Sequence, residues 1–134
     1  MKNLKINERR VGKVTILDIE GNLRIGEGSA QLQQAIRRLL AEGQNQILLN
    51  LGQVAYIDSS GLGEMVAAHV ATSKSGGEIK LLHLTQRVRE LMTITKLVTV
   101  FESYETEAEA LERYKAEETE EKEDAAVAGQ GVGR

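Results

Sequence analysis

The residues best suited to chemistry are the carboxylate and the two adjacent hydroxyls of the sequence DSSGLG, residues 58–63. An apolar, strand-like run precedes this DSSGLG segment, and apolar residues at helical spacing follow it. The segment is therefore predicted to lie where a strand passes into a helix. A helix start carries unpaired N–H groups and a partial positive charge, so its backbone can accommodate a phosphate on a serine. The simpler interpretation is that Ser59 or Ser60 is only the N-cap of the helix.

Two glycines make the segment unusual. Gly61 and Gly63 both fall in the first turn of the predicted helix, where each costs about 1 kcal/mol relative to alanine. One interpretation is that they serve the fold, through a positive φ angle and close packing of the helix on the sheet. The other is that they leave a bare backbone that a partner surface approaches.

The sequence argues against an enzyme. A serine hydrolase needs a base and an orienting acid, and His69 and His83 are the only imidazoles. The chain has neither a Gly-x-Ser-x-Gly motif nor a phosphate-binding loop that ends in Gly-Lys-Ser/Thr. Two histidines without regular ligand spacing do not make a metal site, so we interpret both as structural. We expect a non-enzymatic protein that binds no cofactor or metal itself.

Length and charge indicate one domain with an acidic end. The chain has 134 residues, no cysteine and a formal charge of −3. Residues 115–134 hold six acids and three bases, so residues 1–114 are neutral and lack the basic footprint of a nucleic-acid-binding protein. No apolar run is long enough for a membrane span and no signal peptide opens the chain, which favours a cytoplasmic location. We predict a domain at residues 1–114 and a disordered tail at residues 115–134.

The first half of the domain reads as a hairpin, a helix and a core strand. Residues 4–8 and 14–19 alternate like two strands joined by a short turn. Ser29 is expected to cap the first helix, and Gly43 to end it. The nearly continuous apolar run at residues 47–51 is typical of a strand that is covered on both faces.

The second half repeats the alternation of helix and strand. Residues 79–84 predict another core strand, and Thr85 is expected to cap the helix that follows. A last short strand is expected at residues 98–101, and Thr106 to Glu109 form a capping box for a final helix. Such an alternation predicts an α/β domain.

The DSSGLG segment resembles the signature of bacterial anti-sigma factor antagonists, which belong to the STAS domain family (sulphate transporter and anti-sigma factor antagonist). Residues 19–23, 76–81 and 88–101 resemble further family elements in the expected order, so the resemblance covers most of residues 4–114. It implies a single small α/β domain with a mixed, partly parallel sheet of about four to five strands and about four packed helices.

The resemblance also implies a function. Unphosphorylated antagonists bind an anti-sigma factor that is also a serine kinase and so release the sigma factor. Phosphorylation of the signature serine ends that binding, and a serine phosphatase restores it. The modified serine precedes the glycine, which makes it Ser60 here, with Ser59 as the alternative. The kinase would supply ATP and Mg²⁺. The residues expected to bind the partner are Asp58, Ser59, Gly61, Leu62, Gly63 and Arg24.

Three questions stay open at this point. Asp58 either orients the hydroxyl or contacts the partner, or it is a second helix cap. Many family members carry an acid where this chain has Arg24, which either pairs with Asp58, holds a phosphate on Ser60, or is merely solvated. The alternative function is an interaction module that does not switch, as a subunit of a signalling scaffold or an accessory protein of a membrane lipid transporter.

Overall fold

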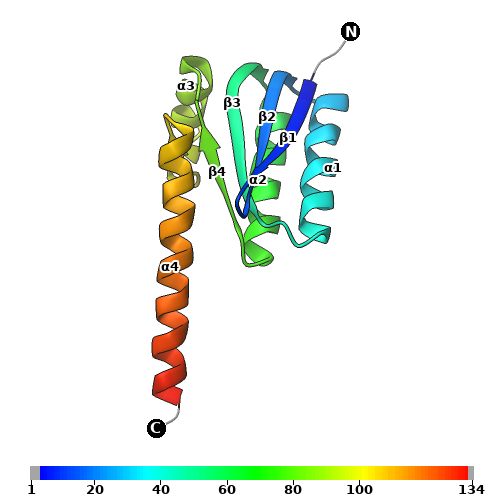
Figure 1. Ribbon diagram of the computed structural model, residues 1–134. Helices are drawn as coiled ribbons and strands as arrows, with labels where there is room; N and C mark the ends of the chain where they lie inside the picture. The colour runs from blue at the N-terminus through cyan, green and yellow to red at the C-terminus, as the bar shows by residue number, and fades with distance from the viewer. Residues whose placement is uncertain (1–3, 133–134) are drawn as a thin grey trace.

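The computed structural model describes the backbone of residues 4–132 and the side chains of residues 4–26 and 28–120. Its centre is a five-stranded sheet in the order β1-β2-β3-β4-β5 (Figure 1). The strands are β1 (Leu4–Val11), β2 (Val14–Leu23), β3 (Gln46–Ile57), β4 (Glu78–Leu82) and β5 (Ser103–Tyr104). The β1–β2 hairpin is antiparallel and all other neighbours are parallel. The predicted mixed sheet is confirmed.

Helices cover both faces of the sheet. They are α1 (Glu27–Ala41), α2 (Ser59–Lys74), α3 (Gln86–Ile94), the short 3-10 helix η1 (Leu97–Thr99) and α4 (Glu107–Val132). The apolar sides of α1, α2 and α3 share one core with β2 and β3, whereas Ala110 and Tyr114 of α4 pack on the opposite face. Ile47, Leu48 and Leu49 of β3 are fully buried between the two layers, which explains the continuous apolar run.

Several local predictions are confirmed. Gly12 and Gly43 have φ angles of 61° and 80°, in the hairpin turn and just after α1. Thr85 caps α3, and its hydroxyl accepts from the N–H of Val88 at 3.2 Å. Thr106 accepts the N–H of Glu109 at 3.2 Å, at the start of α4. Each of these residues acts as its type and position indicate.

Two element predictions are wrong. The helix α1 begins at Glu27 with Gly26 as N-cap, so Ser29 lies within its first turn and is buried. Residues 97–99 form η1 instead of a strand, after Lys96 in a left-handed conformation with φ of 64°. The β-branched residues of this stretch favour a strand locally. The 3-10 turn nevertheless places Phe101 in the core.

The predicted boundary at residue 114 coincides with no break in the structure. The helix α4 continues through residues 115–132, past the level of the hairpin (Figure 1). Alanine, glutamate and lysine dominate this stretch and favour a helix. Glu117 also contacts Lys80 of β4, and Glu118 pairs with Lys13 of the hairpin at 2.7 Å. The segment that was predicted to be a disordered tail thus begins as part of the packed helix.

Candidate functional site

Asp58, the residue between β3 and α2, is the N-cap of α2. Its backbone is extended, with φ of −102°, and its Oδ1 accepts the N–H of Gly61 at 2.9 Å. The prediction that Ser59 or Ser60 is the cap is therefore wrong. The strand β3 ends at Ile57, one residue earlier than a serine N-cap would require. The carboxylate of Asp58 therefore occupies the N-cap position. Both serines are left as the first two residues of the helix.

The same carboxylate also holds the loop between β2 and α1, residues 24–26. Asp58 Oδ2 accepts the N–H of Ile25 at 3.0 Å, and the Asp58 N–H donates to the carbonyl of Leu23 at 3.2 Å. The N–H groups of Gly61 and Ile25, and to a smaller extent the charge of Arg24, hold the pKa of Asp58 below its usual value. The capping alternative for Asp58 is thus observed, together with a second bond that the sequence did not predict.

The two serines differ in their surroundings. Ser59 is exposed. Ser60 is half-buried, and its Oγ lies 3.4 Å from Oγ of Ser29 in α1. Ser29 Oγ in turn donates to the carbonyl of Arg24 at 2.9 Å. Ser60 therefore faces the same 24–26 loop that Asp58 holds.

The two glycines have different roles, and neither has a positive φ angle. A Cβ on Gly61 would lie 2.2 Å from the carbonyl oxygen of Leu23, so this glycine lets α2 pack against the end of β2. A Cβ on Gly63 would meet nothing within 4 Å. Leu62, which was expected to bind the partner, is only 8% exposed and belongs to the core. Of these three residues only Gly63 offers a bare surface.

The structure adds two residues to the site that the sequence analysis missed. Ser29 lies beside Ser60, and Ile25 is 77% exposed although it is apolar. Arg24, predicted from the sequence, lies near enough to Asp58 for its charge to affect the carboxyl pKa. One feature of the sequence could have indicated the exposure of Ile25: it precedes a glycine and lies outside any periodic apolar pattern. The site thus combines the DSSGLG segment with the 24–26 loop.

Comparison with known proteins now identifies the domain. The model of the family described as STAS domain matches residues 5–110. The chain belongs to the STAS domain family. Its relatives include a protein of Thermotoga maritima assigned as an anti-sigma factor antagonist, which is 31% identical over 102 residues, 76% of this chain and 90% of that protein. A homologue from Thermotoga neapolitana is 40% identical over 73 residues, 54% of this chain and 65% of that protein.

Solved structures of STAS proteins agree. The crystal structure of a T. maritima protein assigned as an anti-sigma factor antagonist gives a TM-score of 0.76 at 30% identity, covering 81% of this chain and 92% of that chain. The anti-sigma factor antagonist SpoIIAA in its unphosphorylated form, at 19% identity, has the same fold, with a TM-score of 0.66 over 83% of this chain and 98% of its own. STAS antagonists are regulatory proteins rather than enzymes.

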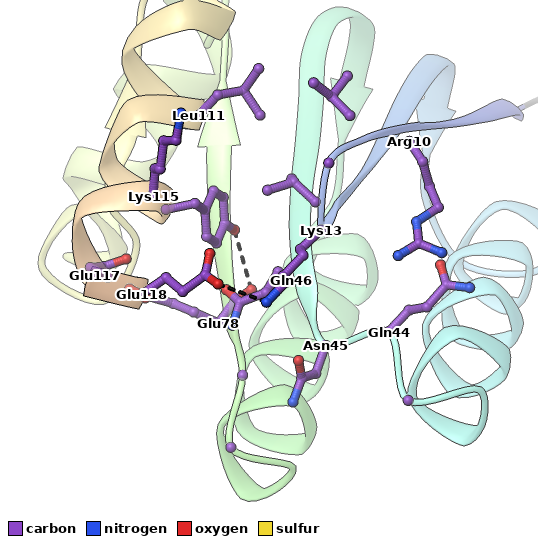
Figure 2. A pocket seen from close by; sticks show the side chains of 17 residues that line it. Arg10, Lys13, Gln44, Asn45, Gln46, Glu78, Leu111, Lys115, Glu117 and Glu118 are labelled. Carbon is purple, nitrogen blue, oxygen red and sulfur yellow. Dashed lines mark hydrogen bonds and ion pairs between the residues drawn. The ribbon is translucent and has the colours of Figure 1, made fainter. Parts of the chain in front are cut away.

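A cavity of about 880 Å³ lies at the other end of this STAS domain. It opens between α4, the hairpin and the loops that precede β3 and β4 (Figure 2). Tyr114 forms part of its wall and donates its hydroxyl to the carbonyl of Glu78 at 3.2 Å. The DSSGLG segment follows the last residue of β3, whereas the cavity adjoins Asn45 and Gln46 at the first. The two sites are therefore separate.

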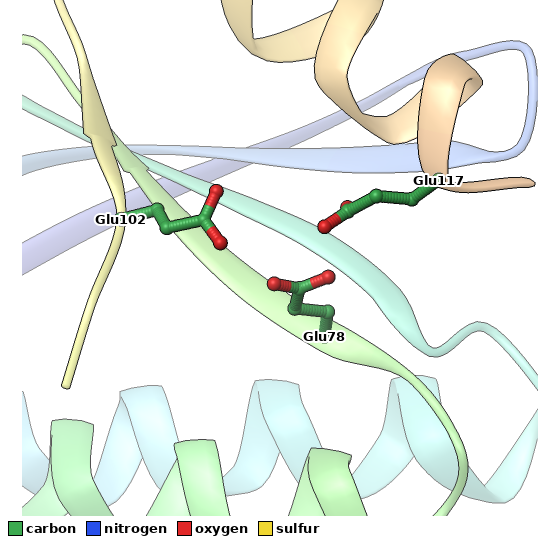
Figure 3. A group of neighbouring side chains, drawn as sticks. All are labelled: Glu78, Glu102 and Glu117. Atoms are coloured by element: carbon green, nitrogen blue, oxygen red, sulfur yellow. The ribbon is translucent and has the colours of Figure 1, made fainter. Parts of the chain in front are cut away.

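Three glutamates gather beside this cavity (Figure 3). The fully buried Lys80 donates to Glu78 at 2.8 Å and to Glu102 at 3.0 Å, and lies 3.0 Å from Glu117. Burial lowers the pKa of Lys80, but the carboxylates more than offset this, and the net pKa is raised. The cation among these carboxylates is thus an ammonium of the chain. This Lys80 cluster joins β4 to α4.

The histidines contact neighbouring side chains of the fold. The ring of His69 packs edge-on against Phe101 at 5.2 Å. His83 Nδ1 lies 3.3 Å from Oδ1 of Asn50. The structural roles expected of both histidines from the sequence remain predictions. None of the described helices has the length and hydropathy required to cross a membrane.

Proposed function

We propose that this chain is an anti-sigma factor antagonist, and that the surface around the DSSGLG segment binds an anti-sigma factor. The observation that carries the proposal is the capping of α2 by Asp58, which leaves both serines free of that role near the exposed Gly63. The relative that aligns over 90% of its own length supports the same function. Arg24, Asp58, Ser59 and Gly63 shape this surface, whereas the buried Gly61 and Leu62 support it from beneath.

Phosphorylation of Ser60 is the proposed switch. A phosphate brings close to two negative charges into a small site that already holds the Asp58 carboxylate. The helix dipole favours the phosphate, but Asp58 has already taken the N–H of Gly61, contrary to our expectation of free donors. Arg24 is the cation that can offset the added charge. Burying this charge against a partner costs enough to break the complex.

Ser60 is preferred over Ser59 because of what surrounds it. The hydroxyl of Ser60 faces Ser29 and the 24–26 loop, so a phosphate there changes the shape of the surface as well as its charge. Ser59 is more exposed and more easily reached, and remains the alternative. In this proposal the partner kinase supplies ATP and Mg²⁺, a serine phosphatase reverses the reaction, and the chain itself needs no cofactor.

A direct test is to mix the purified chain with Mg-ATP and each candidate anti-sigma kinase of its host. Intact-mass spectrometry should detect one added phosphate, and fragmentation should place it on Ser60. Ser60→Ala should abolish the modification while Ser59→Ala retains it. A phosphate on Ser59 alone would reverse the assignment. Binding without phosphorylation by any kinase would instead favour the non-switching interaction module.

A further inference from the structure

Ile25 is the most exposed apolar residue beside the DSSGLG segment. The residue is 77% exposed, while its backbone is held in place by a hydrogen bond. The Ile25 N–H donates to Asp58 Oδ2 at 3.0 Å, and the neighbouring Arg24 carbonyl accepts from both the N–H and the hydroxyl of Ser29, at 3.1 and 2.9 Å. Gly26 follows with φ of 99° and opens α1. An apolar side chain is thus presented to solvent on a fixed loop.

Such an arrangement suits an interface anchor. Binding a residue whose backbone is already ordered costs less conformational entropy than binding one on a loose loop. Interfaces draw most of their energy from a few apolar or aromatic side chains that fill a recess in the partner. Gly63 leaves bare helix backbone nearby, which allows close approach. Since Asp58 uses both carboxylate oxygens on backbone N–H groups, its chemistry is that of a support.

We propose that Ile25 is an apolar anchor that inserts into a recess of the anti-sigma factor, and that Asp58 is a positioning residue which holds Ile25 instead of contacting the partner. This inference rests on the proposed function, and it deepens it by naming the contact that the switch controls. The partner surface that fits is an apolar recess with a polar rim.

The geometry also connects Ser60 to this anchor. Ser60 Oγ lies 3.4 Å from Ser29 Oγ, which donates to the carbonyl one residue before Ile25. A phosphate on Ser60 displaces this contact and repels the Asp58 carboxylate, whose other bond holds the Ile25 N–H. Phosphorylation therefore loosens the anchor in addition to placing charge in the interface.

The support is testable in the free protein by NMR. The amide proton resonances of both Ile25 and Gly61 should follow the titration of Asp58 as the pH is lowered through and below about 3.9, the usual pKa of an aspartate carboxyl, because the pKa of Asp58 is lowered. In Asp58→Ser the shorter hydroxyl can still cap α2 but cannot reach both donors, so the titration at Ile25 should disappear. Ser60→Asp should move the Ile25 amide resonance toward its position in Asp58→Ser. An Ile25 amide resonance that does not titrate would contradict the proposal that Asp58 holds Ile25.

The anchor is testable by affinity for the anti-sigma factor. Ile25→Ala should weaken binding at least about tenfold. The matched control is Ile94→Ala at the end of α3, which removes an equally exposed isoleucine (78%) and should change affinity less than about twofold. Asp58→Ser should weaken binding in the wild-type background. It should add little to Ile25→Ala, because both changes remove the same contact, that of Ile25 with the partner.

The outcomes separate the inference from the function on which it rests. Wild-type affinity in Ile25→Ala, or effects of Ile25→Ala and Asp58→Ser that multiply, would overturn the inference while leaving the proposed function intact. No binding by the unmodified wild-type chain to any anti-sigma factor of its host would contradict the proposed function, and the interface role of Ile25 with it.

Discussion

Carboxylates lie near both ends of β3, and the chain uses them in opposite ways. Near the first residue of β3, the Lys80 cluster sets three glutamates around one buried ammonium. The charges there are neutralised by ion pairs between side chains. Just after the last residue of β3, the single carboxylate of Asp58 accepts hydrogen bonds from backbone N–H groups. The Lys80 cluster joins elements that are distant in sequence, whereas Asp58 shapes one loop and one helix start.

This difference separates a stabilising region from a recognition region. The carboxylates of the Lys80 cluster are partly exposed, but they converge on the buried ammonium and are occupied in pairing with it. Because Asp58 makes its bonds to backbone, the neighbouring hydroxyls and the Ile25 side chain remain at the surface. A change in the first region should therefore alter stability, and a change in the second should alter binding.

The largest expected effect on stability is that of Lys80→Ala. The three carboxylates lose their shared cation while staying close together, which should lower the free energy of unfolding by about 3–5 kcal/mol. Lys13→Ala is the matched control, because its pair with Glu118 is exposed and should contribute less than about 1 kcal/mol. Urea denaturation measures both variants. Equal losses would mean that the buried cluster is no stronger than a surface pair.

The two glycines of the DSSGLG segment give the next test. Gly61→Ala places a methyl group against the Leu23 carbonyl and should destabilise the fold by about 2–3 kcal/mol. Gly63→Ala meets no atom within 4 Å and should stabilise α2 by up to about 1 kcal/mol, while weakening partner binding. Thermal unfolding and affinity should therefore move in opposite directions for Gly63→Ala. A destabilised Gly63→Ala would contradict the assignment of Gly61 to packing and of Gly63 to partner binding.

Shortening α4 tests whether its second half belongs to the stabilising region. A chain that ends at residue 114 lacks Glu117 and Glu118, and its free energy of unfolding should fall by about 1–2 kcal/mol. A chain that ends at residue 120 keeps both contacts and should lose less than about 0.5 kcal/mol. If both truncations leave stability unchanged, the sequence-based boundary at residue 114 is the correct limit of the domain.

The smallest effect is a pH dependence that arises from Glu78. Burial, partly opposed by Lys80 and reinforced by Glu117, raises the pKa of Glu78 above its usual value. The folded state therefore holds this proton more tightly than the unfolded state, and stability should rise slightly as the pH falls through the raised pKa towards about 4.5. Glu78→Gln should remove this rise in urea titrations at several pH values. An unchanged profile would exclude Glu78 as its source.

The acid limb of the same profile should have the opposite sign. The Tyr104 hydroxyl and Lys80 lower the pKa of Glu102, and Arg9 lowers those of Asp18 and Glu107. Groups with lowered pKa values stabilise the fold above their unfolded pKa and lose that contribution as the pH falls through the folded value. Stability should thus decline below about pH 4, whether or not Glu78 is replaced.

Local chemistry in the sequence predicted much of this fold. The alternation of apolar runs gave the hairpin, the core strand and the order of elements, and Thr85 and Thr106 cap helices as expected. The choice between Asp58 and the two serines could not be made in this way. All three are good caps, and the end of β3, set by its pairing with β2, decides among them.

Residues that act through tertiary contacts were not predictable. Glu78, Lys80, Glu102 and Glu117 are spread over 40 positions and meet only when α4 packs on β4. Ile25 lies outside any periodic apolar pattern in the sequence, but only the fold shows that it is 77% exposed on a loop that Asp58 holds. The sequence suggested that residues 117–121 extend the last helix by one turn, but the helix continues to Val132, because helix propensity persists where apolar periodicity fails.

The central claim is that charge on Ser60 controls partner binding. Isothermal titration of the anti-sigma factor with wild-type, Ser60→Ala and Ser60→Asp chains tests it most directly, with Ser59→Ala and Ser59→Asp as the matched pair. We predict that Ser60→Ala binds within about threefold of the wild type and that Ser60→Asp binds more than about a hundredfold more weakly, a change of roughly 3 kcal/mol. Equal affinities of Ser60→Ala and Ser60→Asp would contradict the account.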